Sequence, residues 1–155
     1  ERNFRLVVSC VDRYEARRAV QFDPIPELVL TTGTGDFLLT VSRHRLGDGL
    51  SCALCYQPRE RAGPGCGQAS EGAQAAFELP IEPSIGFVSL LAGVLLGAEL
   101  LKEIVPAWHR GRLKNTLRYQ VLRRRGKVFE RAKEEGCGCG SRFAAAAYRE
   151  AWGGA

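Results

Sequence analysis

The hydrophobic and polar positions at the start of the chain predict a strand followed by a helix. Residues 4–10 form a short run of β-branched and apolar residues, typical of a strand that is buried on both faces. Asp12 can cap a helix, because a glutamate three positions later completes a capping box. We therefore expect a helix from Asp12 to about residue 20, ended by Pro24 and Pro26.

The later apolar segments predict two strands joined at a glycine-rich bend, a long helix, a hairpin and a closing helix. These elements are expected at residues 27–32 and 36–43, 85–105, 115–122 with 127–129, and 142–152. The apolar run from Ile85 to Ala98 is shorter than the ~20 residues that cross a bilayer, so it predicts a buried helix and no membrane span. The hairpin is favoured over a long basic helix because apolar and polar residues alternate after residue 115.

Composition narrows the class of protein. The chain has 155 residues, of which 45% are hydrophobic and 25% charged, which predicts one globular domain and excludes a disordered or collagen-like chain. It contains no methionine, so we expect a fragment or a processed product. The formal net charge of +5 allows an anionic partner without demanding one. The basic stretch 109–127 is interpreted as a solvated hairpin face, and nucleic-acid binding is not expected.

Six cysteines carry the most specific chemical signal in the sequence. Cys52 and Cys55 have the spacing of a metal-binding knuckle, and the distant pair Cys137 and Cys139 is flanked by glycines that free the backbone. Together the pairs predict a structural zinc site with four thiolates, in a chain that resides in the reducing cytoplasm. The competing interpretation makes the second pair a linker and completes the site with Cys66 or His44.

Two further cysteines stand alone. Cys66 lies in the segment from Tyr56 to Gln74, whose Gly, Pro, Arg and Ser content predicts a long loop. Nearby arginines favour its thiolate, so Cys66 is either a reactive nucleophile or an ordinary loop cysteine. Cys10 ends the first strand and is expected to pack in the core.

The order of these parts resembles the carboxy-terminal half of the ThiF/MoeB-like adenylyltransferases of the ubiquitin-activating-enzyme superfamily. The resemblance covers residues 6 to about 139. It is carried, in chain order, by SCVDRYEAR, TTGTGDFLLTVSRHRLGDGLSCALC, RAGPGCGQAS, IGFVSLLAGVLLGAELLKE and the CGC at Cys137 to Cys139. It implies an α/β fold, a partial Rossmann-like domain with a mixed sheet, occupying residues 1–140 with a crossover loop at about 56–76. A helical tail at 141–155 follows.

The resemblance also implies chemistry. Asp12 stands at the family aspartate that holds Mg²⁺ beside ATP, although the same residue could act only as a helix cap. Arg17 stands at the family arginine, and Cys66 at the crossover-loop thiol that receives an activated acyl group. The family's phosphate loop has no counterpart in this sequence, so the fragment alone is expected to be inactive.

Two functions follow as hypotheses. The first is part of an ATP-dependent adenylyltransferase, usually a homodimer, that activates the carboxyl terminus of a ubiquitin-like or sulfur-carrier protein. The second is a zinc-stabilised protein-interaction module without catalysis. His44 and His109 are isolated from any nucleophile and carboxylate set, so a hydrolase triad is not expected.

Overall fold

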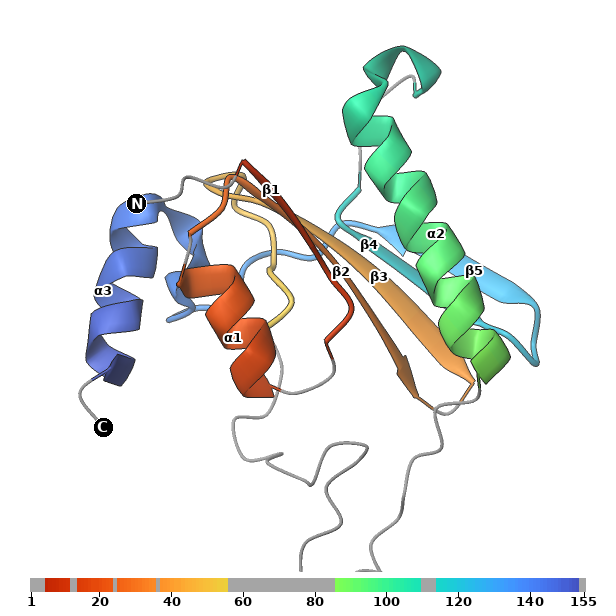
Figure 1. Cartoon of the computed structure of the whole chain (residues 1–155), viewed down its shortest axis with the longest axis horizontal. Helices are drawn as coiled ribbons and strands as arrows, with labels where there is room; N and C mark the ends of the chain where they lie inside the picture. Colours follow the sequence, from red (N-terminus) through yellow and green to blue (C-terminus); the bar gives the residue numbers. More distant parts are fainter. Residues whose placement is uncertain are drawn as a thin grey trace, which may run out of the picture.

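A mixed five-stranded sheet organises the described part of the chain, an α/β arrangement seen in a computed structural model (Figure 1). The structure describes residues 5–11, 14–23, 25–35, 37–55, 86–109 and 114–153. The elements in chain order are β1 (Leu6–Ser9), α1 (Tyr14–Phe22), β2 (Leu28–Gly35), β3 (Leu38–Arg45), α2 (Gly86–Ile104), the 3-10 turn η2 (Pro106–Trp108), β4 (Thr116–Gln120), β5 (Arg125–Phe129), the 3-10 turn η3 (Gly138–Gly140) and α3 (Arg142–Gly153).

The strands lie in the sheet in the order of the sequence. β1 pairs with β2 in parallel, and α1 connects them, whereas the β2–β3, β3–β4 and β4–β5 pairs are antiparallel. A parallel pair needs a crossover connection, which α1 supplies, and the antiparallel pairs need only turns or loops. The order and type of the predicted elements are therefore confirmed for the described residues.

One face of the sheet is apolar and carries α2. Residues alternate across a strand, so Leu28 and Leu30 point to the same face. The register pairs Val41 with Thr32 and Leu39 with Thr34, which puts both on that face as well. These side chains meet the inner face of α2 in one buried cluster, which consists of Leu28, Leu30, Leu39, Val41, Val88, Ala92 and Leu96. Figure 1 shows α2 crossing this face.

Ion pairs fix the carboxyl end of α2 to the same sheet. Glu103 accepts hydrogen bonds from Arg43 and from Arg45 of β3, the latter at 2.9 Å between Arg45 Nη2 and Glu103 Oε2. The Glu103 and Arg43 side chains are only 10% and 11% exposed. The pair therefore sits at the edge of the core rather than in open solvent.

The opposite face of the sheet is polar in its middle and buried at one end. Thr31, Gly33, Thr40 and Ser42 point to this face, as the alternation in β2 and β3 requires. Beside it, α1, α3 and the cysteine segments form a second cluster, which consists of Phe22, Cys52, Leu54, Cys55, Cys139 and Ala145. The rings of Phe22 and Tyr148 join α1 to α3 with centroids 4.7 Å apart.

Three sequence predictions need correction. The strand predicted at 4–10 is not buried on both faces: β1 is an edge strand, so Val8 is 44% exposed and Cys10 is exposed instead of packed in the core. The bend predicted at the glycines is also displaced. Gly33 and Gly35 lie within β2, and the chain turns after them, where Phe37 adopts a φ of 56°.

The third correction concerns α2, which was predicted as a buried helix. Only one side of it is buried, whereas Phe87, Leu90 and Val94 on the other side are 53%, 71% and 61% exposed. The reason is architectural, because the described residues provide a single sheet for α2 to pack on. No described helix is both long enough and apolar enough to span a membrane.

Candidate metal centre

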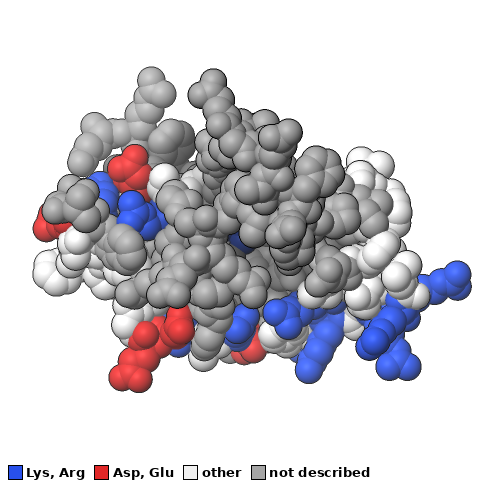
Figure 2. Space-filling model, turned by 90° about the horizontal axis from the view of Figure 1, so that it is seen from below, with Lys and Arg blue, Asp and Glu red and all other residues white. Residues whose placement is uncertain are grey.

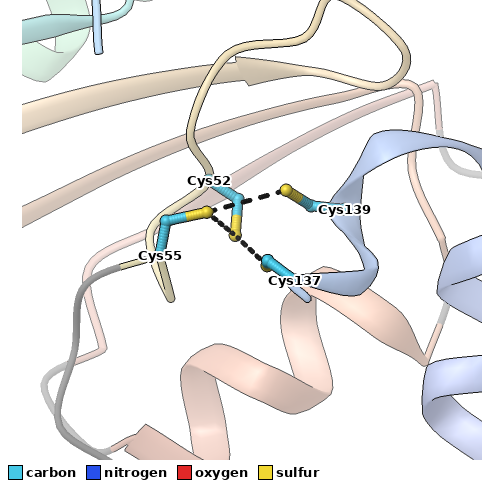
Figure 3. Close-up of side chains that lie close together, drawn as sticks. All are labelled: Cys52, Cys55, Cys137 and Cys139. Carbon is cyan, nitrogen blue, oxygen red and sulfur yellow. Dashed lines mark hydrogen bonds between the residues drawn. The ribbon is translucent and has the colours of Figure 1, made fainter. Parts of the chain in front are cut away.

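The four cysteines of the two pairs lie together in space. Cys52 and Cys55 come from the segment after β3, and Cys137 and Cys139 from the segment before α3, more than eighty residues later in the chain (Figure 3). Their Sγ atoms all lie within 4.8 Å of one another, so the cluster could hold a metal ion. The second cysteine pair lies with the first, as the sequence predicted, and His44 is not part of the set.

The distances between the sulfurs exclude disulfides in the cluster. The Sγ atoms of Cys52 and Cys55 are 3.8 Å apart, and those of Cys52 and Cys137 and of Cys55 and Cys139 are both 3.7 Å apart. A disulfide would bring two sulfurs to about 2.0 Å. All four cysteines are free thiols, and three of them are buried.

Tight turns after β3 position the first pair. Gly47 and Gly49 adopt φ angles of 83° and 74°, a left-handed region that favours glycine. The backbone N–H of Leu50 donates to Asp48 Oδ1 at 2.9 Å, which closes an Asx turn between them. The backbone N–H of Leu54 then donates to Cys52 Sγ at 3.4 Å, as expected of a knuckle that wraps around its first ligand.

Close packing against α3 positions the second pair. Gly136 has a φ of 79°, which suits glycine at the turn before Cys137. Gly138 serves a different purpose: a Cβ built there would lie 2.5 Å from Tyr148 Cβ, so only glycine lets α3 approach this closely. The hydroxyl of Ser141 accepts from the backbone N–H of Ala144 at 3.1 Å and caps the start of α3.

Asn115 holds the two cysteine-bearing segments against each other, and sequence reasoning missed it. It is 1% exposed, and its Nδ2 donates to the carbonyl oxygens of Ser51 and Arg131 at 3.3 and 3.1 Å. Its Oδ1 accepts from the backbone N–H of Arg131 at 2.7 Å. A polar residue just before a strand carries no sequence signal of this role, because its partners come from two distant segments.

The thiols cannot all ionise without a cation. Hydrogen bonding with Cys137 raises the pKa of the Cys52 thiol and the pKa of the Cys139 thiol. For Cys55, hydrogen bonding with Cys137 lowers the pKa. Protons are therefore shared unequally within the cluster. A coordinated cation would allow all four thiols to ionise, because a thiol that binds a metal ion is held deprotonated.

His44 is buried beside the cluster but is not part of it. Burial lowers the pKa of His44, an effect that Asp48 and Cys55 oppose electrostatically. No hydrogen bond reaches either ring nitrogen from the described residues. The imidazole is thus buried beside the cysteines, and among the described residues the possible metal-binding group consists of the four cysteines.

The other predicted site residues have different outcomes. Cys66, Asp12 and the crossover loop lie outside the described residues. Arg17 lies on α1, and its Nε donates to the carbonyl oxygen of Val11 at 2.7 Å, just past the end of β1. Its guanidinium also lies over Gly33 of β2, where an added Cβ would come within 2.9 Å of Nη2.

A groove runs over the polar face of the sheet from Arg17 toward the hairpin. Its volume is about 390 Å³, and its lining includes Arg17, Arg118 and Arg131 together with hydroxyl side chains of β2 and β3. No carboxylate contributes to this lining among the described residues. The groove therefore favours an anionic or carbonyl-rich ligand, and it passes next to Cys52 and Cys55.

Basic side chains gather at the end of the molecule where the β4–β5 hairpin lies (Figure 2). The register sets Arg118 opposite Lys127, and both are exposed, with Arg123 to Arg125 at the turn between the strands. This matches the predicted solvated hairpin face. The turn residue Arg124 has a φ of 50°.

Comparisons with known proteins add no relative to these observations. No protein-family model matches the chain, and no curated protein matches it.

Proposed function

We propose that this chain is a zinc-stabilised carboxy-terminal part of a ThiF-type adenylyltransferase, which activates the carboxyl terminus of a ubiquitin-like or sulfur-carrier protein. The observation that carries the proposal is the convergence of two distant cysteine pairs on one point beside a mixed sheet. This is the arrangement that the order of motifs in the sequence implies. The Rossmann-like character of the complete domain belongs to the same proposal.

Zinc is the metal that the donor set suits best. A Zn–S bond of about 2.3 Å in a tetrahedron separates neighbouring sulfurs by about 3.8 Å. The Sγ–Sγ distances of 3.7 and 3.8 Å in the cluster agree with this value. Four thiolates leave no open coordination position, so the zinc would stabilise the fold and take no part in a reaction.

The place of the groove supports adenylation. Open α/β sheets bind ligands beyond the carboxyl ends of parallel strands, and Arg17 lies at the end of β1 over the neighbouring strand β2. The arginines of the groove would bind the carboxylate of an extended carrier-protein tail and screen its charge. Asp12, which the resemblance assigns to Mg²⁺, would contribute the carboxylate that binds this ion.

ATP, bound by a nucleotide-binding half, would supply the adenylyl group and release pyrophosphate. The Cys66 thiolate would then attack the carbonyl carbon of the acyl-adenylate, with loss of AMP and formation of a thioester. In this scheme the described residues bind and orient the tail.

A zinc-stabilised interaction module is the second candidate. It is favoured by the buried, self-contained character of the cysteine cluster, which Asn115 and α3 support without help from a nucleotide site. In that case the groove would bind an acidic peptide and no adenylate would form.

Zinc analysis of the purified chain tests the metal. We expect about one zinc per molecule, which Cys52→Ser or Cys137→Ser should abolish because structural zinc sites require all four ligands. Cys10→Ser is the matched control, because Cys10 is an exposed cysteine outside the cluster. Full metal content in both cluster variants would overturn the four-cysteine site.

Pyrophosphate exchange separates the two functions. A protein that joins this chain to an upstream nucleotide-binding half should exchange pyrophosphate into ATP when the carrier protein is present. Asp12→Asn should abolish exchange while leaving the melting temperature unchanged, because asparagine caps a helix almost as well as aspartate. Equal exchange in the parent and Asp12→Asn would return Asp12 to a capping role, whereas no exchange in the parent would favour the interaction module.

A further inference from the structure

We infer that the β4–β5 hairpin is the docking surface for an acidic, extended segment of another protein. Five basic side chains form this surface, here named the basic hairpin: Arg118, Arg123, Arg124, Arg125 and Lys127. All five are exposed, and Arg125 and Lys127 lie outside the lining of the groove. The inference depends neither on the metal nor on adenylation.

The cations of the basic hairpin have no acidic partner within the described part of the chain. Elsewhere the cations are matched: Arg43, Arg45 and Lys102 each form an ion pair with a glutamate of α2. None of the ion pairs between described residues includes a cation of the basic hairpin. The positive charge of this surface can therefore attract an anionic partner.

The register of the hairpin brings like charges face to face. Arg118 of β4 stands directly opposite Lys127 of β5. Like charges at opposite positions of an antiparallel pair destabilise that pair. The fold therefore gains no stability from the charge of these two side chains. A carboxylate bound between them would replace repulsion by attraction, which gives the pair a reason in binding.

The spacing along β5 suits a partner in an extended conformation. Arg125 and Lys127 are two residues apart, so they point to the same face of the sheet with roughly 6.5 Å between them. Every second side chain of an extended peptide is separated by the same distance. A segment with acidic residues at alternate positions can therefore place one carboxylate beside each cation.

Arg118 connects the basic hairpin to the polar face of the sheet. It stands opposite Lys127 on one side and opposite Thr40 of β3 on the other, and it also lines the groove. No described carboxylate contributes to the lining of the groove. The positive potential thus extends over this side of the sheet, and it would steer an acidic partner toward the hairpin.

The other side chains of the hairpin favour a protein partner over a nucleic acid. Single-stranded nucleic acids are held by aromatic rings on which the bases stack. The hairpin has two such rings: Tyr119 packs against the cluster between α2 and the sheet, and Lys127 Nζ lies over the Phe129 ring, 5.6 Å from its centroid. Leu122 and Val128, which are 66% and 50% exposed, are instead apolar surface that a polypeptide can cover.

Fluorescence anisotropy with the full chain tests this surface. The probe is a labelled peptide of about twelve residues in which glutamate and threonine alternate, and the comparison peptide has the same composition with its glutamates in one block. We expect the alternating peptide to bind more tightly, because its spacing matches β5. Binding should weaken as sodium chloride rises from about 0.05 to about 0.5 M. Single-stranded oligothymidylate of similar length should bind more weakly than the alternating peptide.

Two variants locate the binding surface. Arg125→Gln and Lys127→Gln should each weaken binding of the alternating peptide about threefold, and together about tenfold, as expected for exposed ion pairs. Neither should lower the melting temperature, and Lys127→Gln should raise it slightly, because repulsion from Arg118 is removed. Arg142→Gln is the matched control: it removes the same charge at an exposed position of α3, away from the hairpin, and should leave the affinity nearly unchanged (Figure 1).

Several results would overturn the inference. They are a parent chain that does not bind the alternating peptide, equal binding of the two peptides, or equal affinity in the parent and the double variant. Tighter binding of oligothymidylate that the double variant loses would assign the surface to nucleic acid. Self-association of the double variant with unchanged peptide affinity would show that the charges only protect the edge of the sheet. If either variant lowers the melting temperature, Arg123→Gln in the turn replaces it, with the same expected loss of affinity.

Discussion

Asn115 shows how much of the cysteine centre depends on a residue that binds no metal. Its side chain satisfies two carbonyl groups and one N–H group, all from the two segments that carry the cysteines. Buried polar groups that lose a partner cost about 1–3 kcal/mol each. Asn115 is therefore a structural clamp whose removal leaves several groups unpaired at once.

We predict that Asn115→Leu lowers the free energy of unfolding by about 2–4 kcal/mol, because the shape of the side chain is kept while its hydrogen bonds are lost. Urea unfolding followed by circular dichroism measures the change. Lys114→Ala, at the exposed neighbouring position, should stay within about 0.5 kcal/mol of the parent chain. An equally small effect at Asn115 would show that the clamp contributes nothing.

Gly138 is the second residue whose identity the packing dictates. An alanine there would place its Cβ 2.5 Å from Tyr148 Cβ and 3.1 Å from the carbonyl oxygen of Ala144, so α3 would have to move. We predict that Gly138→Ala costs about 1–3 kcal/mol, the range of overpacked sites, and weakens metal binding. Thermal unfolding and metal titration measure both effects. Gly136→Asn is the control, because asparagine tolerates the positive φ of that position.

At the scale of elements, the attachment of α2 to β3 combines apolar packing with one carboxylate. Glu103 is shared by two arginines, whereas Glu99, which is similarly buried, pairs with Lys102 of the same helix. Breaking a nearly buried ion pair leaves an uncompensated charge, and the cost is smaller where the partner is more exposed, as Lys102 is at 33% beside Glu99.

We predict that Glu103→Gln lowers the free energy of unfolding by about 2–3 kcal/mol, somewhat less than a fully buried pair because Arg45 is half exposed. Glu99→Gln, the matched change at a similarly buried side chain of the same helix, should cost less, about 1 kcal/mol, because Glu99 gives up one half-buried partner where Glu103 gives up two. Chemical denaturation of both variants makes the comparison. Equal losses of unfolding free energy in the two variants would mean that the contact between Glu103 and β3 stabilises the fold no more than the pair within α2.

At the scale of the whole molecule, the described residues pack in two clusters with different supports. One joins α2 to the sheet, and the other joins the cysteines to α1 and α3. The second cluster contains few large apolar side chains, so a bound metal would supply much of its cohesion. The first has a continuous apolar core and does not rely on the cysteines.

We predict that chelation loosens the two clusters unequally. After zinc removal, amide hydrogen exchange should accelerate first in residues 50–55 and 131–153, while β2, β3 and α2 keep their protection, because local opening follows the weakest contacts. Exchange followed by mass spectrometry of peptides reads the order. Simultaneous loss of protection in both regions would indicate that the metal holds the whole molecule together.

Local patterns along the sequence determined most of the elements. Alternation and helical periodicity located β2, β3, the hairpin and the helices, because these signals depend only on which side chains neighbour each other along the chain. The cysteine spacing likewise singled out four candidate ligands, since metal chemistry limits the residue types and separations that are useful.

Only the tertiary structure decided what those elements face. It placed β1 at the sheet edge and so exposed Cys10, and it gave Gly138 and Asn115 roles set by partners far away in the sequence. It also buried one side of α2 and left the other exposed among the described residues, although both sides carry large apolar residues in the sequence. Burial depends on which surfaces a fold brings together, and the periodicity of one segment does not contain that information.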